Sequence, residues 1–118
     1  MNLNIVLWVV QAILAAMFLM AGVMKALQYE RAKASLPWVK DVSKGLVTFI
    51  GVSELLGGLG ILLPWLTGIL PWLTPLAAAG LALIMLLAII FHARRGESSA
   101  IIFNVVLLVL AAFVAYGR

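Results

Sequence analysis

The sequence contains no cysteine and a single histidine, and only 10% of its 118 residues are charged. Without cysteine, the chain cannot itself form disulfides, iron–sulfur clusters or thiolate metal sites. With one histidine, it cannot supply the usual bis-histidine pair of a membrane haem. No metal, flavin or nucleotide motif is recognisable. An enzymatic activity is therefore left undecided, and a non-catalytic role is favoured.

Hydrophobic residues, by contrast, make up 66% of the chain. A soluble domain of this size would expose much of that apolar surface to water, so the bilayer is the expected solvent. Helices are the single-segment structures that satisfy their own backbone hydrogen bonds in hydrocarbon. The sequence therefore predicts an all-α membrane protein, a bundle of four transmembrane helices that is in contact with lipid.

Four apolar segments are long enough to span a bilayer, and together they predict one transmembrane domain over residues 1–118. The expected helices cover about 3–27, 46–63, 74–91 and 99–116, joined by loops at 28–45, 64–73 and 92–98. A cleaved signal peptide is the alternative for the first segment. No Lys or Arg precedes Lys25, so we expect a retained helix instead.

Basic residues lie in the loops at 28–45 and 92–98, whereas the opposite side has only Arg118. The positive-inside rule places these two loops in the cytoplasm and both termini outside a cell (inner) membrane. The net charge of +4 comes from basic residues at the ends of the membrane spans, where they are attracted to anionic lipid headgroups. Nucleic acid is therefore not an expected partner.

Three polar side chains fall within the predicted spans: Gln11, Glu54 and Asn104. Helical rise places Gln11 level with Glu54 near the midplane, with Asn104 slightly further inward. The same estimate puts Lys25 about 20 Å below Glu54, too far for a direct pair and suited to snorkelling. We therefore expect Glu54 to be neutral and to donate a hydrogen bond to Gln11, Asn104 or a backbone carbonyl.

Glycines accompany this acid, because Gly51 precedes it by one turn and Gly57 and Gly58 follow it by one turn. Small residues let helices approach closely, so these three and Gly22 are candidate packing positions within or between protomers. Glu54 could then be a polar clasp between helices or a proton or ligand site, and the sequence does not separate these interpretations.

The predicted membrane surfaces carry the remaining candidates. Lys25 and His92 lie at the inner interface, where His92 is an interfacial residue or a proton relay or ligand contact. The loop at 28–45 is divided by Pro37 and is expected to lie on the headgroups, with docking of a redox partner as the alternative. In the outer loop, Trp65 and Trp72 fit an interfacial aromatic belt better than a lid over a ligand path.

Four stretches occur together and in order: "AGVMKAL", "GVSELLGGLGILLP", "PLAAAGLALIMLLAIIFHARRGE" and "NVVLLVLAAFVAYGR". They resemble the DoxX-like family of small bacterial membrane proteins over essentially the whole chain. The resemblance implies a four-helix membrane bundle, and it suggests that Lys25, Glu54 and His92 match positions that the family favours. The family takes its name from a membrane subunit of a thiosulfate:quinone oxidoreductase.

The resemblance favours a non-catalytic membrane subunit or anchor of a quinone-linked redox complex. Such a subunit would have a soluble or membrane redox partner and a site for a quinone or a lipid between its helices. One alternative is binding or transport of a small hydrophobic molecule or lipid. Another is a factor that assembles other membrane proteins. A homo-oligomer is compatible with each of these.

Overall fold

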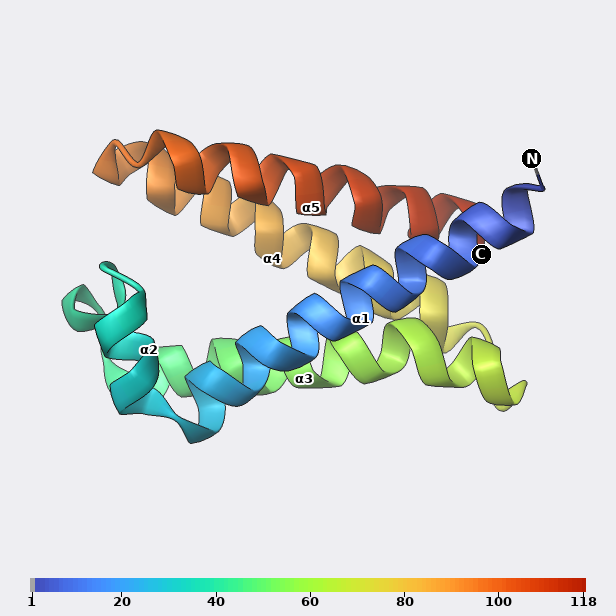
Figure 1. The fold of residues 1–118 in the computed structure, drawn as a ribbon, viewed down its shortest axis with the longest axis horizontal. Coiled ribbons are helices and arrows are strands. Elements are labelled where there is room, and N and C mark those ends of the chain that lie inside the picture. Colours follow the sequence, from blue (N-terminus) through green and yellow to red (C-terminus); the bar gives the residue numbers. More distant parts are fainter. Residues whose placement is uncertain (1) are drawn as a thin grey trace.

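The computed structural model describes residues 2–118 and is helical nearly throughout. Its elements are α1 (Leu3–Leu27), α2 (Tyr29–Ser35), the 3-10 turn η1 (Val39–Asp41), α3 (Lys44–Thr67), α4 (Leu73–Arg95) and α5 (Ser98–Gly117) (Figure 1). Four of these helices, α1, α3, α4 and α5, are long and apolar enough to cross a membrane. The predicted all-α, four-span membrane fold is confirmed.

Local sequence explains where the helices begin and end. Asn2 and Ser43 cap α1 and α3, since their side chains accept hydrogen bonds from the backbone N–H groups of Asn4 and Leu46. Such caps satisfy donors that the first turn leaves unpaired. Three helices are longer than the sequence predicts: α3 continues past Pro64 to Thr67, α4 reaches Arg95, and α5 covers Ser98–Gly117.

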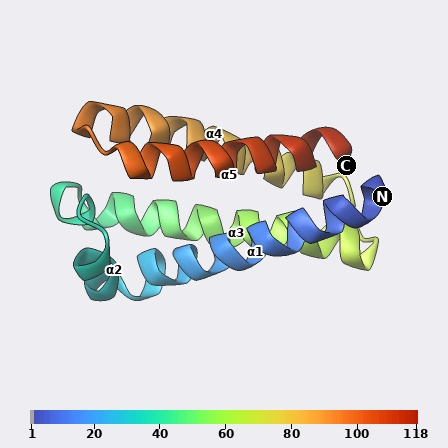
Figure 2. The same cartoon turned by 45° about the horizontal axis from the view of Figure 1, so that its top comes forward.

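The spans form two antiparallel pairs, α1 with α3 and α4 with α5, as both views show (Figures 1 and 2). The pairs converge at the end that carries both chain termini, which we call the terminal end. They separate toward α2, which we call the loop end. The long axis of 42 Å matches the thickness of a bilayer with its headgroups, and the apolar outer side chains suit contact with lipid.

Packing between the two pairs is concentrated toward the terminal end. The buried core there contains Leu14, Ala15, Phe18, Ile61, Ala78, Leu81, Met85, Leu107, Ala111 and Val114. Helices α1 and α5 also meet closely near their ends, where Gly117 leaves room for Leu7: a Cβ at Gly117 would lie 2.6 Å from Leu7 Cδ2. The two helix pairs therefore pack tightly at the terminal end and leave space between them at the loop end.

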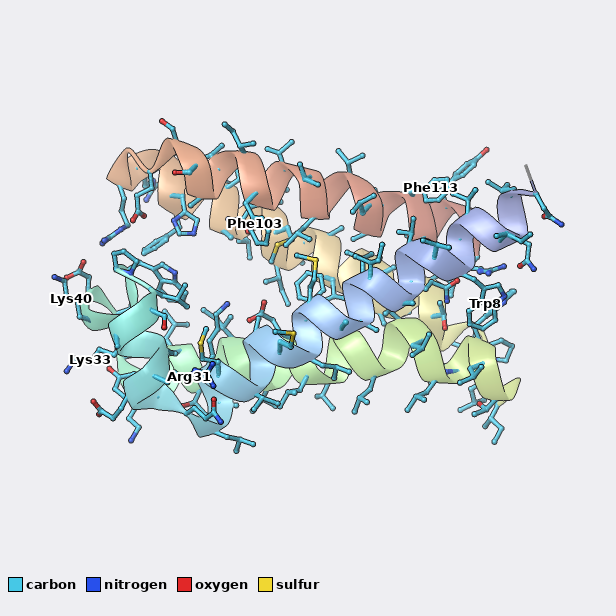
Figure 3. The ribbon with its side chains drawn as sticks, in the orientation of Figure 1. Trp8, Arg31, Lys33, Lys40, Phe103 and Phe113 are labelled. Carbon is cyan, nitrogen blue, oxygen red and sulfur yellow. The ribbon has the colours of Figure 1, made fainter. Side chains whose placement is uncertain are left out.

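A second, smaller core forms at the loop end. Ala32 of α2, Val39 of η1 and Val47 of α3 are buried together. The loop at 28–45, predicted to rest on the headgroups, therefore folds partly back onto the bundle. Its basic side chains Arg31, Lys33 and Lys40 are still exposed, and Figure 3 shows Lys33 and Lys40 projecting away from the bundle.

Candidate functional site: a cavity at the loop end

A cavity of about 520 Å³ lies between the two helix pairs toward the loop end. All four membrane spans and the loop that follows α2 contribute to its wall, which is mostly apolar. Met17, Phe18, Met85, Phe103 and Leu107 are among the apolar lining residues. Volumes of this size are typical of small-molecule sites. The arrangement provides a mostly apolar, partly open cavity between the membrane-spanning helices.

Polar side chains reach this cavity from four different elements. Lys25 comes from α1, Glu54 from α3, His92 from α4 and Asn104 from α5. These are four of the five polar candidates that the sequence identifies, so the tertiary structure gathers them around one space. Gln11 is the exception, because it lies nearer the terminal end.

Lys25 and Glu54 form a direct ion pair, with Lys25 Nζ 2.8 Å from Glu54 Oε1. The side chains are 13% and 3% exposed, respectively. The prediction that Lys25 lies too far from Glu54 and snorkels away is therefore wrong. The expectation that Glu54 donates to Gln11, Asn104 or a backbone carbonyl is wrong as well, because its hydrogen-bonding partner is the Lys25 ammonium.

The error in the depth estimate has a physical reason. The estimate assumed that α1 ends and α3 begins at the same depth in the membrane. In the structure, the first part of α3 extends beyond the last residue of α1, so Glu54 lies closer to the end of α1 than the estimate placed it. A Cβ built at Gly51 would lie 2.5 Å from the backbone nitrogen of Ala26, so these residues are level. Glu54 is one turn further along α3, and Lys25 is adjacent to Ala26. Close packing of the two helices completes the pair, since a Cβ at Gly22 would lie 2.7 Å from Gly51 O.

Gln11 has partners of its own. Its Nε2 donates to Ile61 O at 2.8 Å, and its Oε1 accepts from Arg118 Nε at 2.7 Å. Arg118 also donates to Asn4 Oδ1 at 2.7 Å and lies over the rings of Trp8 and Trp65. Burial lowers the pKa of the Arg118 guanidinium, which nevertheless keeps its charge. Gln11 is thus part of a structural cluster, and the sequence interpretation missed Arg118 as its partner.

Asn104 is 8% exposed and lines the cavity. The predicted hydrogen bond between Asn104 and Glu54 is not seen in the described part of the chain. The Glu54 carboxyl group accepts a hydrogen bond from Lys25 instead. A buried amide usually has a hydrogen-bond partner, and a ligand in the cavity could supply one for Asn104.

His92 is held in a network at the loop end of the cavity. Its Nδ1 lies 2.8 Å from Glu97 Oε1, and Arg95 Nε donates to the same oxygen at 2.9 Å. Arg95 also pairs with Asp41 Oδ2 at 2.7 Å, which ties α4 to η1. Hydrogen bonds from His92 and Arg95 lower the pKa of Glu97, against the opposing effect of desolvation.

A tight turn brings Glu97 back to His92. Gly96 adopts a left-handed conformation with φ of 71°, which favours glycine because it has no Cβ. The backbone N–H of Glu97 then donates to His92 O at 3.1 Å. The sequence interpretation did not select Glu97, although its position five residues after the sole histidine and directly after a glycine could have indicated this turn.

Trp38 and Glu97 both line the cavity, and the sequence did not predict this for either residue. The Trp38 ring meets those of Phe91 and His92 edge to face, with centroid separations of 5.9 and 6.3 Å. Lys25 Nζ lies 5.4 Å from the Trp38 ring centroid, within the range of a cation–π contact. Trp38 therefore stands between the Lys25–Glu54 pair and His92 at the loop end of the cavity.

The glycines flanking Glu54 lie at two different interfaces. Gly51 and Gly58 face α1, since Cβ atoms there would meet Ala26 and Leu19, whereas Gly57 faces Leu81 of α4. Close approach on both sides lets α3 pack tightly against both neighbours.

These features define a class of protein: a small helical membrane protein with a mostly apolar cavity between its helix pairs, lined by an ion pair, a histidine and an amide. A model of the DoxX-like family matches residues 9–114. The chain belongs to the DoxX-like family, as its motifs predict. No match came from the curated proteins or from the solved structures.

Proposed function

We propose that this protein binds a small, largely apolar molecule that carries one polar group, in the cavity between its helix pairs. The observation that carries the proposal is the placement of Lys25, Glu54, His92 and Asn104 around a single apolar space of about 520 Å³. Convergent polar groups in an apolar pocket are typical of ligand sites, where they orient the bound molecule.

The apolar and polar side chains line different parts of the cavity, and this supports a defined orientation of the ligand. Its apolar part would lie against Phe18, Met85 and Leu107, deeper in the bundle. Its polar part would lie toward the loop end, near Lys25, Trp38 and His92. Because Lys25 already has Glu54 as its counterion, the site favours a neutral polar group over a free anion.

The test is to fill the cavity. Ala88 lines it, so Ala88→Phe should reduce the amount of small molecule that co-purifies with the protein in lipid nanodiscs, measured by native mass spectrometry. Ala79→Phe is the matched control, because Ala79 is exposed on the outer surface of the same helix. Equal ligand content in both variants and in the unaltered protein would contradict binding in this cavity.

Our second candidate is the non-catalytic membrane subunit or anchor of a quinone-linked redox complex. A quinone is apolar and presents carbonyl oxygens, which could accept hydrogen bonds from the Lys25 ammonium beside the cavity. Recovery of a quinone together with a soluble flavoprotein would support this function. A bound molecule without any partner protein would favour the first candidate.

We also propose that the protein lies in the cell (inner) membrane with its loop end in the cytoplasm. Support comes from the basic residues there, which include exposed Lys33, Lys40 and Arg94. The chain has no cysteine, so single cysteines can be introduced without background. Ala34→Cys should resist an impermeant thiol reagent in intact cells and Ile69→Cys, at an exposed position of the opposite loop, should react. The opposite pattern would reverse the orientation.

A further inference from the structure

One ring nitrogen of His92, Nδ1, forms a hydrogen bond with Glu97, and the other, Nε2, is left for a further partner. Nδ1 lies 2.8 Å from Glu97 Oε1, and the side chain is 8% exposed. Edge-to-face contacts with Trp38 and Phe91 hold the ring in place. Since His92 also lines the cavity, Nε2 is the polar atom that this side chain retains for a bound molecule.

The partner of Nδ1 decides what Nε2 can do. Arg95 donates to the same Glu97 oxygen, and together these donors lower the pKa of Glu97. The carboxyl group is therefore ionised and can only accept hydrogen bonds. Nδ1 must then carry the proton, and in a neutral imidazole Nε2 is left with a lone pair. The Glu97 carboxylate thus prepares His92 as a hydrogen-bond acceptor toward the cavity.

The other side of the cavity supplies donors. The Lys25 ammonium has three N–H groups, one of which is directed to Glu54. The buried amide of Asn104 both donates and accepts. A ligand that satisfies both sides of this site must itself donate one hydrogen bond, to His92, and accept another.

We infer that the ligand carries a hydroxyl group, which donates to His92 Nε2 and accepts from the opposite wall of the cavity. In this arrangement His92 is the specificity-determining residue, and Glu97 is a positioning residue that sets its tautomer. The ligand class is a long-chain or polycyclic apolar alcohol. The inference rests on the proposed function and adds which polar group the site recognises.

An ether or ketone of the same shape offers only acceptors, so it would leave Nε2 facing a group that cannot donate to it. A site with a buried polar atom discriminates strongly against a ligand that leaves this atom unpaired. One neutral hydrogen bond of this kind corresponds to about a tenfold difference in affinity.

The binding test uses a long-chain alcohol with bromine two carbons beyond the hydroxyl-bearing carbon, so that base does not close it to an epoxide, and the methyl ether of the same compound. Bromine quenches tryptophan fluorescence at contact, so the protein is prepared in nanodiscs with Trp8, Trp65 and Trp72 changed to Phe, leaving Trp38 as the reporter. At alkaline pH, the alcohol should quench Trp38 at about tenfold lower concentration than the ether. His92→Phe should abolish this preference while both compounds still bind.

The outcomes separate the two proposals. Quenching by both compounds at equal concentration in the protein with His92 intact would overturn the hydroxyl inference and leave the cavity as a binding site. Absence of quenching by either compound would count against the proposed function itself. Glu30→Gln serves as the control, because Glu30 is exposed on α2 and its substitution should leave the preference unchanged.

A second measurement needs no substitution at the site. The chain has one histidine, so a nitrogen-15 NMR spectrum of histidine-labelled protein reports His92 alone. At alkaline pH the spectrum should show the proton on Nδ1 alone, and Glu97→Ala should convert it to a mixture of tautomers. A proton found on Nε2 in the unaltered protein would overturn the inference.

Discussion

Lys25 Nζ lies 2.8 Å from Glu54 Oε1 across the interface of α1 and α3. This contact depends on Gly22 and Gly51, which bring the two backbones so close that a Cβ at either position would lie less than 3 Å from a backbone atom of the other helix. The ion pair and the glycines therefore act together. Both charges are largely removed from solvent, which makes each one costly without the other.

Removal of Lys25 should therefore greatly reduce the stability of the folded protein. Lys25→Met leaves Glu54 without its cation, and loss of one partner of a buried pair costs about 3–5 kcal/mol of unfolding free energy. The double variant Lys25→Met with Glu54→Leu should recover much of that loss, because no buried charge remains. Thermal unfolding in detergent measures the effect, and Lys33→Met on the exposed side of α2 is the control. Equal stability of the two lysine variants would show that the pair is unimportant.

A methyl group at the helix contact should also disturb the pair. Gly51→Ala would place a Cβ 2.5 Å from the backbone nitrogen of Ala26, and overpacking of this kind costs about 1–3 kcal/mol. Gly80→Ala provides the comparison, since no atom lies within 4 Å of a Cβ there and alanine is the better helix former. Unfolding temperatures should fall for the first variant and stay level or rise for the second. The reverse order would contradict the close approach of α1 and α3.

The terminal end should depend on Arg118. This side chain donates to Gln11 and Asn4 and stacks on Trp8 and Trp65. Arg118→Met keeps the apolar stem but leaves Gln11 Oε1 unpaired, at a cost of about 1–3 kcal/mol. Tryptophan fluorescence and thermal unfolding measure the change. Arg118→Lys should restore only part of the stability, because an ammonium lacks the planar fork of a guanidinium.

Stability should fall at acid pH through Glu97. Its pKa is lowered in the folded protein from an ordinary value of 4.5, so its stabilising contribution is fully present above that value. The contribution is lost as the pH falls through the lower, folded-state pKa, where the carboxylate that binds His92 and Arg95 becomes protonated.

Unfolding temperature measured against pH checks this prediction. Glu97→Gln should remove part of the acid-side decline, whereas Glu30→Gln should leave the profile unchanged because Glu30 is exposed. A profile for Glu97→Gln that matches the unaltered protein would show that the carboxylate does not contribute.

Much of the architecture could be predicted because membrane spans are determined by local composition. Long apolar segments determine how many helices cross the bilayer, irrespective of what they pack against. The helix ends were harder to place, as Pro64 illustrates: the prediction ended the span before this proline, and the helix runs one turn further. The loss of one backbone hydrogen bond near a helix end does not stop a helix that is held by its neighbours.

The site could be predicted only in part. Glu54, Lys25, His92 and Asn104 were identifiable because polar side chains are rare within apolar segments. Their partners were not, because the depth of each residue was counted from the ends of its own helix. Helices that start at different levels and cross at an angle shift this count, and the shift was large enough to hide the pair of Lys25 with Glu54.

The sequence by itself thus determined the solvent, the number of spans, the family and the few polar groups that must be accommodated in hydrocarbon, because composition and periodicity act within each segment. Tertiary structure alone decided which groups meet: Lys25 with Glu54, Gln11 with Arg118, and His92 with Glu97 across the turn at Gly96. It also decided that the helix pairs separate toward the loop end and leave a cavity. Such relationships depend on the offset and angle between helices, which no single segment specifies.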